Sequence, residues 1–171
     1  MISLKFKAAV LFVVFVGFAA CGYRFTGGGD LPEGVSNVNI PLFQNRTSET
    51  GIEQTFTNDL IFEFLRAGRS VQKDRNKADA ILNGVIKTFR VDSASRKGTI
   101  TTAERRVTIS VDLELLAPDG RIIWNRNGLR ANETYDVASD RLAEERNQQE
   151  AIDALSKRLA ERIYISLTDD F

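Results

Sequence analysis

One stretch of strict alternation limits the possible fold more than any other part of the sequence. Large apolar side chains occupy every second position: Val107, Ile109, Val111, Leu113 and Leu115. The positions between them are polar or charged: Arg106, Thr108, Ser110, Asp112 and Glu114. Because successive side chains of a β-strand point to opposite faces, this pattern predicts a long strand with one buried face. The other face of the sheet must then meet water or a polar partner.

Two further strands are expected beside this one. Pro118-Asp119-Gly120 predicts a turn, since Pro fixes φ, Asp bonds the nearby backbone and Gly accepts positive φ. The partner strand follows over 121–135, with a bulge near Asn127-Gly128. Residues 80–91 carry apolar groups on both parities, which predicts a central strand that is partly covered on each side. Gly84 within it indicates a bulge or a close approach.

Two amphipathic helices complete the expected fold. One apolar stripe runs over 52–65, after a capping-box pattern at 50–53 and before a terminating Gly68. A second helix is expected over 139–168. A short strand over 35–43 reaches the later strands across the first helix, as parallel pairing requires. The prediction is an α+β two-layer sandwich: a mixed, mostly antiparallel sheet of about four strands, packed by two helices.

The N-terminus has the pattern of a secretory signal peptide. Lys5 and Lys7 precede an uncharged run over 8–18, and small residues lead to Cys21, the only cysteine. The run is shorter than the roughly 20 residues of a membrane span. Phe18-Ala19-Ala20-Cys21 resembles the lipobox of bacterial lipoproteins, in which the cysteine receives a lipid. An ordinary signal peptide with an incidental cysteine, or a buried N-terminal helix, is the alternative.

These boundaries predict three parts of the chain. We expect a signal peptide over 1–20, a lipidated Cys21 with a flexible tether over 21–36, and a single α+β domain over 37–171. Removing the signal peptide takes two of the 23 basic residues and none of the 23 acidic residues. No basic excess therefore points to nucleic acid as a partner.

Composition also excludes several kinds of catalytic and metal site. The sequence contains no histidine and one cysteine. This rules out zinc sites built from His or Cys, Cys–His and Ser–His–Asp nucleophile systems, and an intramolecular disulfide. Carboxylate-only chemistry stays open, but no paired acids occur in an apolar setting that would raise a pKa. We therefore expect a non-enzymatic protein with no metal and no cofactor.

The candidate binding residues surround a long polar connection over 92–103. Its length exceeds the two to five residues usual in a β-hairpin, and binding often occurs in such loops. Arg96 and Lys97 lie in the connection, and Arg105 and Arg106 begin the next strand. The four would cluster if the hairpin closes. A solvated hairpin tip with ordinary surface charge is the alternative.

The sequence also resembles a known family. The resemblance is carried, in chain order, by Cys21-Gly22-Tyr23, Leu31-Pro32, the run VNIPLFQNRT over 38–47, Ala78-Asp79-Ala80 before Gly84, Asp119-Gly120 before Trp124, and Glu133-Thr134-Tyr135. This combination is similar to the LptE family of lipopolysaccharide-assembly lipoproteins. The resemblance implies a non-enzymatic subunit of the lipopolysaccharide translocon, seated as a plug in the β-barrel of LptD, where it assists barrel assembly and binds lipopolysaccharide.

The resemblance also implies a location and a ligand. Gly22, instead of aspartate, follows the cysteine, as in lipoproteins released to the outer membrane, so a lipid anchor on its periplasmic side is expected. Lipopolysaccharide carries phosphates, which makes Arg96, Lys97, Arg105 and Arg106 its expected contacts. An alternative of another class shares the anchor and the fold: a lipoprotein that binds and activates a periplasmic cell-wall synthesis enzyme.

Overall fold

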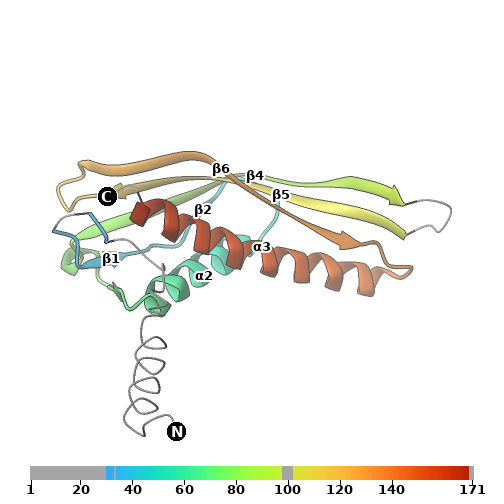
Figure 1. The fold of residues 1–171 in the computed structure, drawn as a ribbon, viewed down its shortest axis with the longest axis horizontal. Coiled ribbons are helices and arrows are strands. Elements are labelled where there is room, and N and C mark those ends of the chain that lie inside the picture. The colour runs from blue at the N-terminus through green and yellow to red at the C-terminus, as the bar shows by residue number, and fades with distance from the viewer. Residues whose placement is uncertain (1–29, 33, 98–101, 170–171) are drawn as a thin grey trace, which may run out of the picture.

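The structure is a computed structural model that describes the backbone of residues 30–32, 34–97 and 102–169. A single sheet lies over a layer of two long helices (Figure 1). The strands are β1 (Asn37–Asn39), β2 (Gln44–Asn45), β3 (Ser70–Val71), β4 (Ala80–Lys97), β5 (Thr102–Leu116) and β6 (Ile122–Asp136). The helices are α2 (Ile52–Arg66), the short 3-10 helix η1 (Arg75–Lys77) and α3 (Arg141–Asp169). The predicted α+β two-layer architecture is confirmed.

The sheet is mixed, as predicted, but it contains six strands where about four were expected. Its order is β3-β1-β4-β5-β6, and β2 also pairs with β4. β4, β5 and β6 form an antiparallel meander, whereas β1 runs parallel to both β3 and β4. The additional strands β2 and β3 have two residues each. The sequence predicts a short extended piece around Val71, where β3 lies, but it predicts a loop over 44–51, because two residues are too few to show an alternating pattern.

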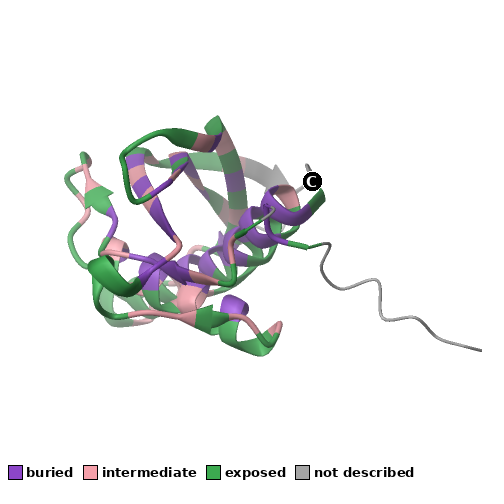
Figure 2. Cartoon of the chain, turned by 90° about the vertical axis from the view of Figure 1, so that its left-hand side faces the viewer, coloured by how far each residue is buried: buried purple, intermediate pink, exposed green. Residues whose placement is uncertain are grey.

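The core lies between the sheet and the helices. The five apolar residues of β5 that alternate over 107–115 are all fully buried there, which confirms the pattern. Leu60 and Phe64 of α2 and Leu159 of α3 pack against them from the helix layer. Figure 2 shows buried residues gathered where the helices meet the sheet, with exposed residues on the outer surfaces.

Register shifts adjust the pairing of the long strands. In β4 the register shifts between Ile86 and Thr88, so Ile86 and Phe89 both pair with inward-facing residues of β5. This explains the change of apolar parity along β4. In β6 the predicted bulge at Asn127-Gly128 is confirmed. Gly128 has a φ of 66°, and its N–H donates to Oδ1 of Asp112 on β5 at 2.8 Å.

The ends of the helices differ in part from expectation. Gly68 has positive φ after α2, as predicted. The capping-box prediction at 50–53 is wrong, because Gly51 is the N-cap in a left-handed conformation and no side chain caps it. For α3, Asp140 takes the capping position, since its Oδ1 accepts the N–H of Ala143 at 2.9 Å. Both helices nevertheless bury the apolar stripes that the sequence showed.

Candidate functional site

The predicted site residues do not all fall within the described part of the chain. Cys21, the predicted lipid acceptor, lies outside the described residues. The backbone places Arg96 and Lys97 at the end of β4, opposite Ala103 and Thr102 of β5. The structure therefore closes β4 and β5 into one long hairpin. Side chains are described again from Glu104 onward.

Arg105 lies on the face of the sheet that packs against α3. Its Nη1 donates to Oε1 of Glu144 at 3.0 Å, and Oε2 of that carboxylate accepts the N–H of Ala138 at 2.8 Å. Tyr135 is the partner of Arg105 across the β5–β6 ladder, and its hydroxyl donates to Oε1 of Gln148 at 3.4 Å. Burial raises the pKa of Tyr135, while the hydrogen bond with Arg105 acts in the opposite direction. Arg105 thus connects the beginning of β5 to the first turn of α3.

Arg106 belongs to the opposite face. It pairs across the ladder with Asp92 of β4 and Thr134 of β6, and its side chain is exposed. Neighbouring residues of a strand point to opposite sides, so Arg105 and Arg106 cannot join one patch on a single face. The hairpin brings the four predicted positions together in the backbone, but the two described side chains are divided between its faces. Whether they bind lipopolysaccharide stays a prediction.

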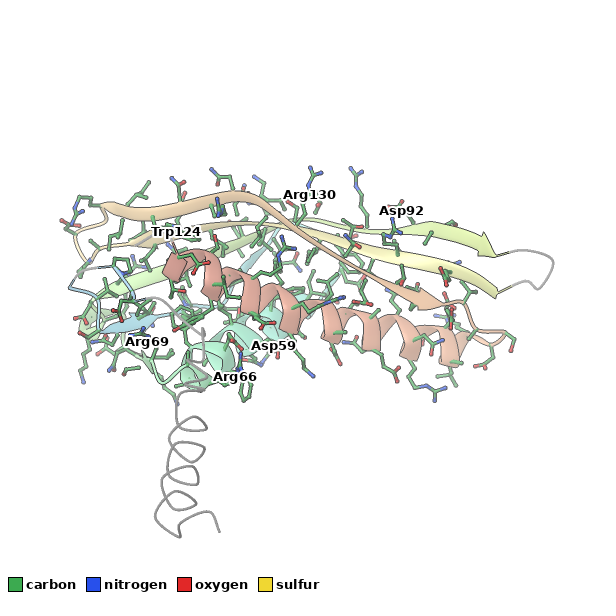
Figure 3. All side chains as sticks on the ribbon, viewed as in Figure 1. Asp59, Arg66, Arg69, Asp92, Trp124 and Arg130 are labelled. Carbon is green, nitrogen blue, oxygen red and sulfur yellow. The ribbon has the colours of Figure 1, made fainter. Side chains whose placement is uncertain are left out.

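The outer sheet face, which points away from the helices, is polar along β4, β5 and β6. Rows of partners across the sheet include Arg90, Thr108 and Asn132, and next to them Thr88, Ser110 and Arg130. Figure 3 shows Arg130 and Asp92 on the side of the sheet that faces away from the helices. This outer sheet face presents hydrogen-bond donors, acceptors and charges of both signs.

A shallow hollow of about 300 Å³ opens on the outer sheet face. It is lined by Arg46, Asn83, Val85, Lys87, Asp112, Glu114 and Asn127. Nζ of Lys87 lies 3.4 Å from Oδ2 of Asp112, whose other oxygen accepts the N–H of Gly128. Arg46 comes from the β2 region, far away in sequence. The sequence did not predict this hollow. The polar positions of β5 indicated only the sheet face on which it lies.

α3 covers the free edge of β6. Nη1 of Arg162 donates to the carbonyl of Arg130 at 2.8 Å, and Nη2 of Arg158 donates to the carbonyl of Asn132 at 3.4 Å. Farther along, Nδ2 of Asn147 donates to the carbonyl of Asp136 at 2.8 Å. The three carbonyls share one parity, so all point away from β5. Side chains of α3 therefore satisfy an edge that would otherwise be open to strand addition.

Several residues that carry the family resemblance hold local structure together. Oδ2 of Asp79 accepts three donors, the N–H groups of Ser36 and Asn37 and the side-chain amide of Asn37, at 2.8–3.0 Å. Asn45 donates through Nδ2 to Oε2 of Glu53 at 2.8 Å, which joins β2 to the first turn of α2. Oδ1 of Asp119 accepts the N–H of Arg121 in the β5–β6 turn at 3.0 Å. These motif residues therefore specify the fold.

The described residues offer a binding surface and no metal centre. Within ranges 30–32, 34–97 and 102–169, no group of three or more His, Cys, Asp or Glu side chains is arranged to hold a metal ion. In the same ranges, neither long helix has the length and apolar character that crossing a membrane requires. The chemistry that this arrangement supports is polar, non-covalent recognition across an elongated sheet.

Comparison with solved structures places this fold among bacterial lipoproteins. A lipoprotein from Caulobacter crescentus is 18% identical, with a TM-score of 0.53 over 74% of this chain and 88% of that one. A minor lipoprotein from Acinetobacter baumannii is 15% identical, with a TM-score of 0.54 over 80% and 92%. The rare lipoprotein B from Shewanella oneidensis is 15% identical, with a TM-score of 0.53 over 75% and 94%. At these identities the likeness concerns the fold alone.

The family follows from the sequence itself. The LptE family, described as lipopolysaccharide-assembly, matches residues 35–167, which include every strand and nearly all of α3. The chain belongs to the LptE family. A comparison with curated proteins found no match.

Proposed function

We propose that this protein is a non-enzymatic lipoprotein of lipopolysaccharide assembly that lies inside an LptD-type β-barrel at the outer membrane. Membership of the LptE family supports this role. Lipidation of Cys21 would hold the protein at the periplasmic side of the membrane. More than one acyl chain is needed there, because a single chain binds a membrane only weakly. No cofactor takes part. Its two partners are the barrel protein and lipopolysaccharide, a glycolipid.

The observation that carries the proposal is the polar outer sheet face. The lumen of an outer-membrane barrel is polar, so a protein seated in it needs satisfied polar contacts instead of an apolar patch. Arg90, Arg106 and Arg130 are exposed on this face, with Asp92 among them. Charges of both signs suit a polar wall, because complementary pairs set orientation and exclude wrong partners.

Purification from native membranes tests the proposed partner. The tagged, full-length protein is expected to co-purify with a large outer-membrane barrel. The triple variant Arg90→Glu, Arg106→Glu and Arg130→Glu should lose most of this barrel while keeping its helical circular-dichroism signal. The control reverses Arg141, Arg146 and Lys157, which are exposed on α3 in the helix layer, on the other side of the sheet (Figure 1). Recovery of a peptidoglycan synthase without a barrel would instead support the alternative, an activator of cell-wall synthesis.

Lipopolysaccharide binding needs a separate test, because Arg105 has a structural partner. Reversing Arg105 alone would break its ion pair with Glu144, and a loss of binding could then reflect misfolding. The exchange Arg105→Glu with Glu144→Arg keeps the pair and removes the cation from β5. We expect Arg96→Glu, Lys97→Glu and Arg106→Glu, combined with this exchange, to weaken binding of purified lipopolysaccharide. Unchanged binding by the folded variant would refute the role of these four residues.

A further inference from the structure

The described chain begins beside the C-terminal end of α2. Oδ1 of Asp30 lies 3.3 Å from Nη2 of Arg69, the residue that follows Gly68 after the helix. Leu31 is 6% exposed and belongs to the core. Cys21 precedes Asp30 by nine residues, and an extended chain of that length spans at most about 30 Å. A lipid on Cys21 therefore keeps this end of the domain within about 30 Å of the bilayer.

α2 carries a second apolar side near this end. Its core side is fully packed, with Leu60 and Phe64 at 0% exposure. Phe62 and Leu65, in the last two turns, are instead 63% and 55% exposed. A soluble surface helix usually places charged or polar residues on its outer side. Two large apolar side chains exposed on the outer side of one helix offer an apolar surface that suits contact with an apolar phase.

Basic side chains follow these apolar ones in the sequence: Arg66 directly, and then Lys73, Arg75 and Lys77 after the end of α2. Arg66 follows Leu65 and keeps 54% of its side chain exposed while contacting Glu63. Lys73, Arg75 and Lys77 are all exposed, and none forms an ion pair among the described residues. Asp74, the one acid between Lys73 and Lys77, accepts the N–H of Asn76 as the cap of η1. This segment therefore carries a net positive charge.

We propose that Phe62, Leu65, Arg66, Lys73, Arg75 and Lys77 form a membrane-contact surface that lies on an anionic phospholipid bilayer. The inference rests on the proposed lipidation of Cys21 and concerns the anchored domain when it is not seated in a barrel. Aromatic and aliphatic side chains enter the boundary between headgroups and acyl chains, and Lys and Arg are drawn to anionic headgroups. Each basic residue near such a surface strengthens binding about fivefold. The surface would thereby fix the orientation of the anchored domain, which a tether alone leaves free.

Two spin labels test the orientation in the full-length lipoprotein, reconstituted into vesicles of phosphatidylcholine and phosphatidylglycerol. One label is attached through Leu65→Cys. The matched label uses Leu142→Cys, which is 79% exposed in the first turn of α3, toward the other end of the molecule (Figure 1). We expect the Leu65 label to be accessible to oxygen and protected from a water-soluble nickel chelate. The Leu142 label should show the reverse.

Charge reversal tests the electrostatic part in the same vesicles. Lys73→Glu, Arg75→Glu and Lys77→Glu together should restore nickel access to the Leu65 label. Reversal of Arg90, Arg106 and Arg130 on the outer sheet face adds the same charge elsewhere, and in these vesicles, which contain no barrel, it should leave nickel access to the Leu65 label unchanged. Equal effects of the two triple variants would overturn the proposal. So would equal nickel access of both labels in protein that floats with the vesicles.

Flotation separates this inference from the proposed anchor. If the unlabelled protein fails to float with vesicles, the proposed lipidation of Cys21 is refuted. The membrane-contact surface, which rests on it, is then refuted as well. If it floats but the Leu65 label stays in water, the anchor stands and only the contact surface is refuted. Circular dichroism of every variant verifies that α2 and α3 remain folded.

Discussion

A methyl group at position 84 should disrupt the packing of β2 and α2 on the sheet. A Cβ placed on Gly84 would have three ring carbons of Phe43 within 2.6 Å. Carbon atoms normally approach to 3.5–4.0 Å, so the ring would have to move by about 1 Å or more. The predicted close approach at Gly84 is thus confirmed, and Gly84→Ala is the sharpest test of the core.

Neither Phe43 nor the backbone at Gly84 has room to move away from this contact. Phe43 is 2% exposed, and its N–H donates to Oγ1 of the buried Thr57 on α2 at 3.0 Å. Gly84 pairs with Leu113 in the β4–β5 ladder. Overpacking a core costs about 1–3 kcal/mol, and complete loss of a buried Phe costs about 3–5 kcal/mol. We therefore expect Gly84→Ala to lower the free energy of unfolding by about 2–4 kcal/mol.

Urea denaturation followed by the fluorescence of Trp124, the only tryptophan, measures this change. Thermal unfolding should show a midpoint about 5–15 °C lower. In the double variant with Phe43→Leu, the smaller side chain should relieve the clash, so the effects should differ from additivity by at least about 1 kcal/mol. Asn83→Ala, on the neighbouring outward position, is the control. Loss of less than about 0.5 kcal/mol in Gly84→Ala would refute the packing argument.

Three further perturbations test other parts of the structure. The pKa of Glu53 is lowered by its own backbone N–H and by the Asn45 amide, so its carboxylate stabilises the fold above the ordinary value of 4.5 and loses this effect as pH falls through the lowered pKa. Glu53→Gln should accordingly flatten the dependence of the urea midpoint on pH in that range; an unchanged slope would contradict this. Gly128→Ala should cost about 1–2 kcal/mol in urea denaturation, because Gly128 has a φ of 66° in the β6 bulge, and a neutral result would exclude strain there. Arg158→Ala with Arg162→Ala should uncover the β6 edge and produce concentration-dependent association in sedimentation velocity, whereas Lys157→Ala with Glu161→Ala should remain unassociated.

Part of the candidate site could be predicted from sequence. The alternation of polar and apolar residues in β5 defines the polar outer sheet face. The same alternation, continued back to Arg105 and Arg106, places these two residues on opposite faces of the sheet. The residues that these side chains contact within the folded chain could not be predicted. Glu144 meets Arg105 from 39 positions away, and Arg46 reaches the hollow on the outer sheet face only because β2 pairs with β4. No local signal connects such distant residues.

Side chains that repeat with a regular period were enough to predict the strand β5 and the apolar stripes of α2 and α3, and residue chemistry was enough to predict the turn at Pro118-Asp119-Gly120. Such a repeat indicates which face is buried, because side chains at regular spacing lie on one side of the element. Strand β2, the pairing of β3 with β1 and the cover of the β6 edge by α3 could be found only in the folded protein. These features arise from backbone groups, which are the same in every residue and acquire partners only when distant segments meet.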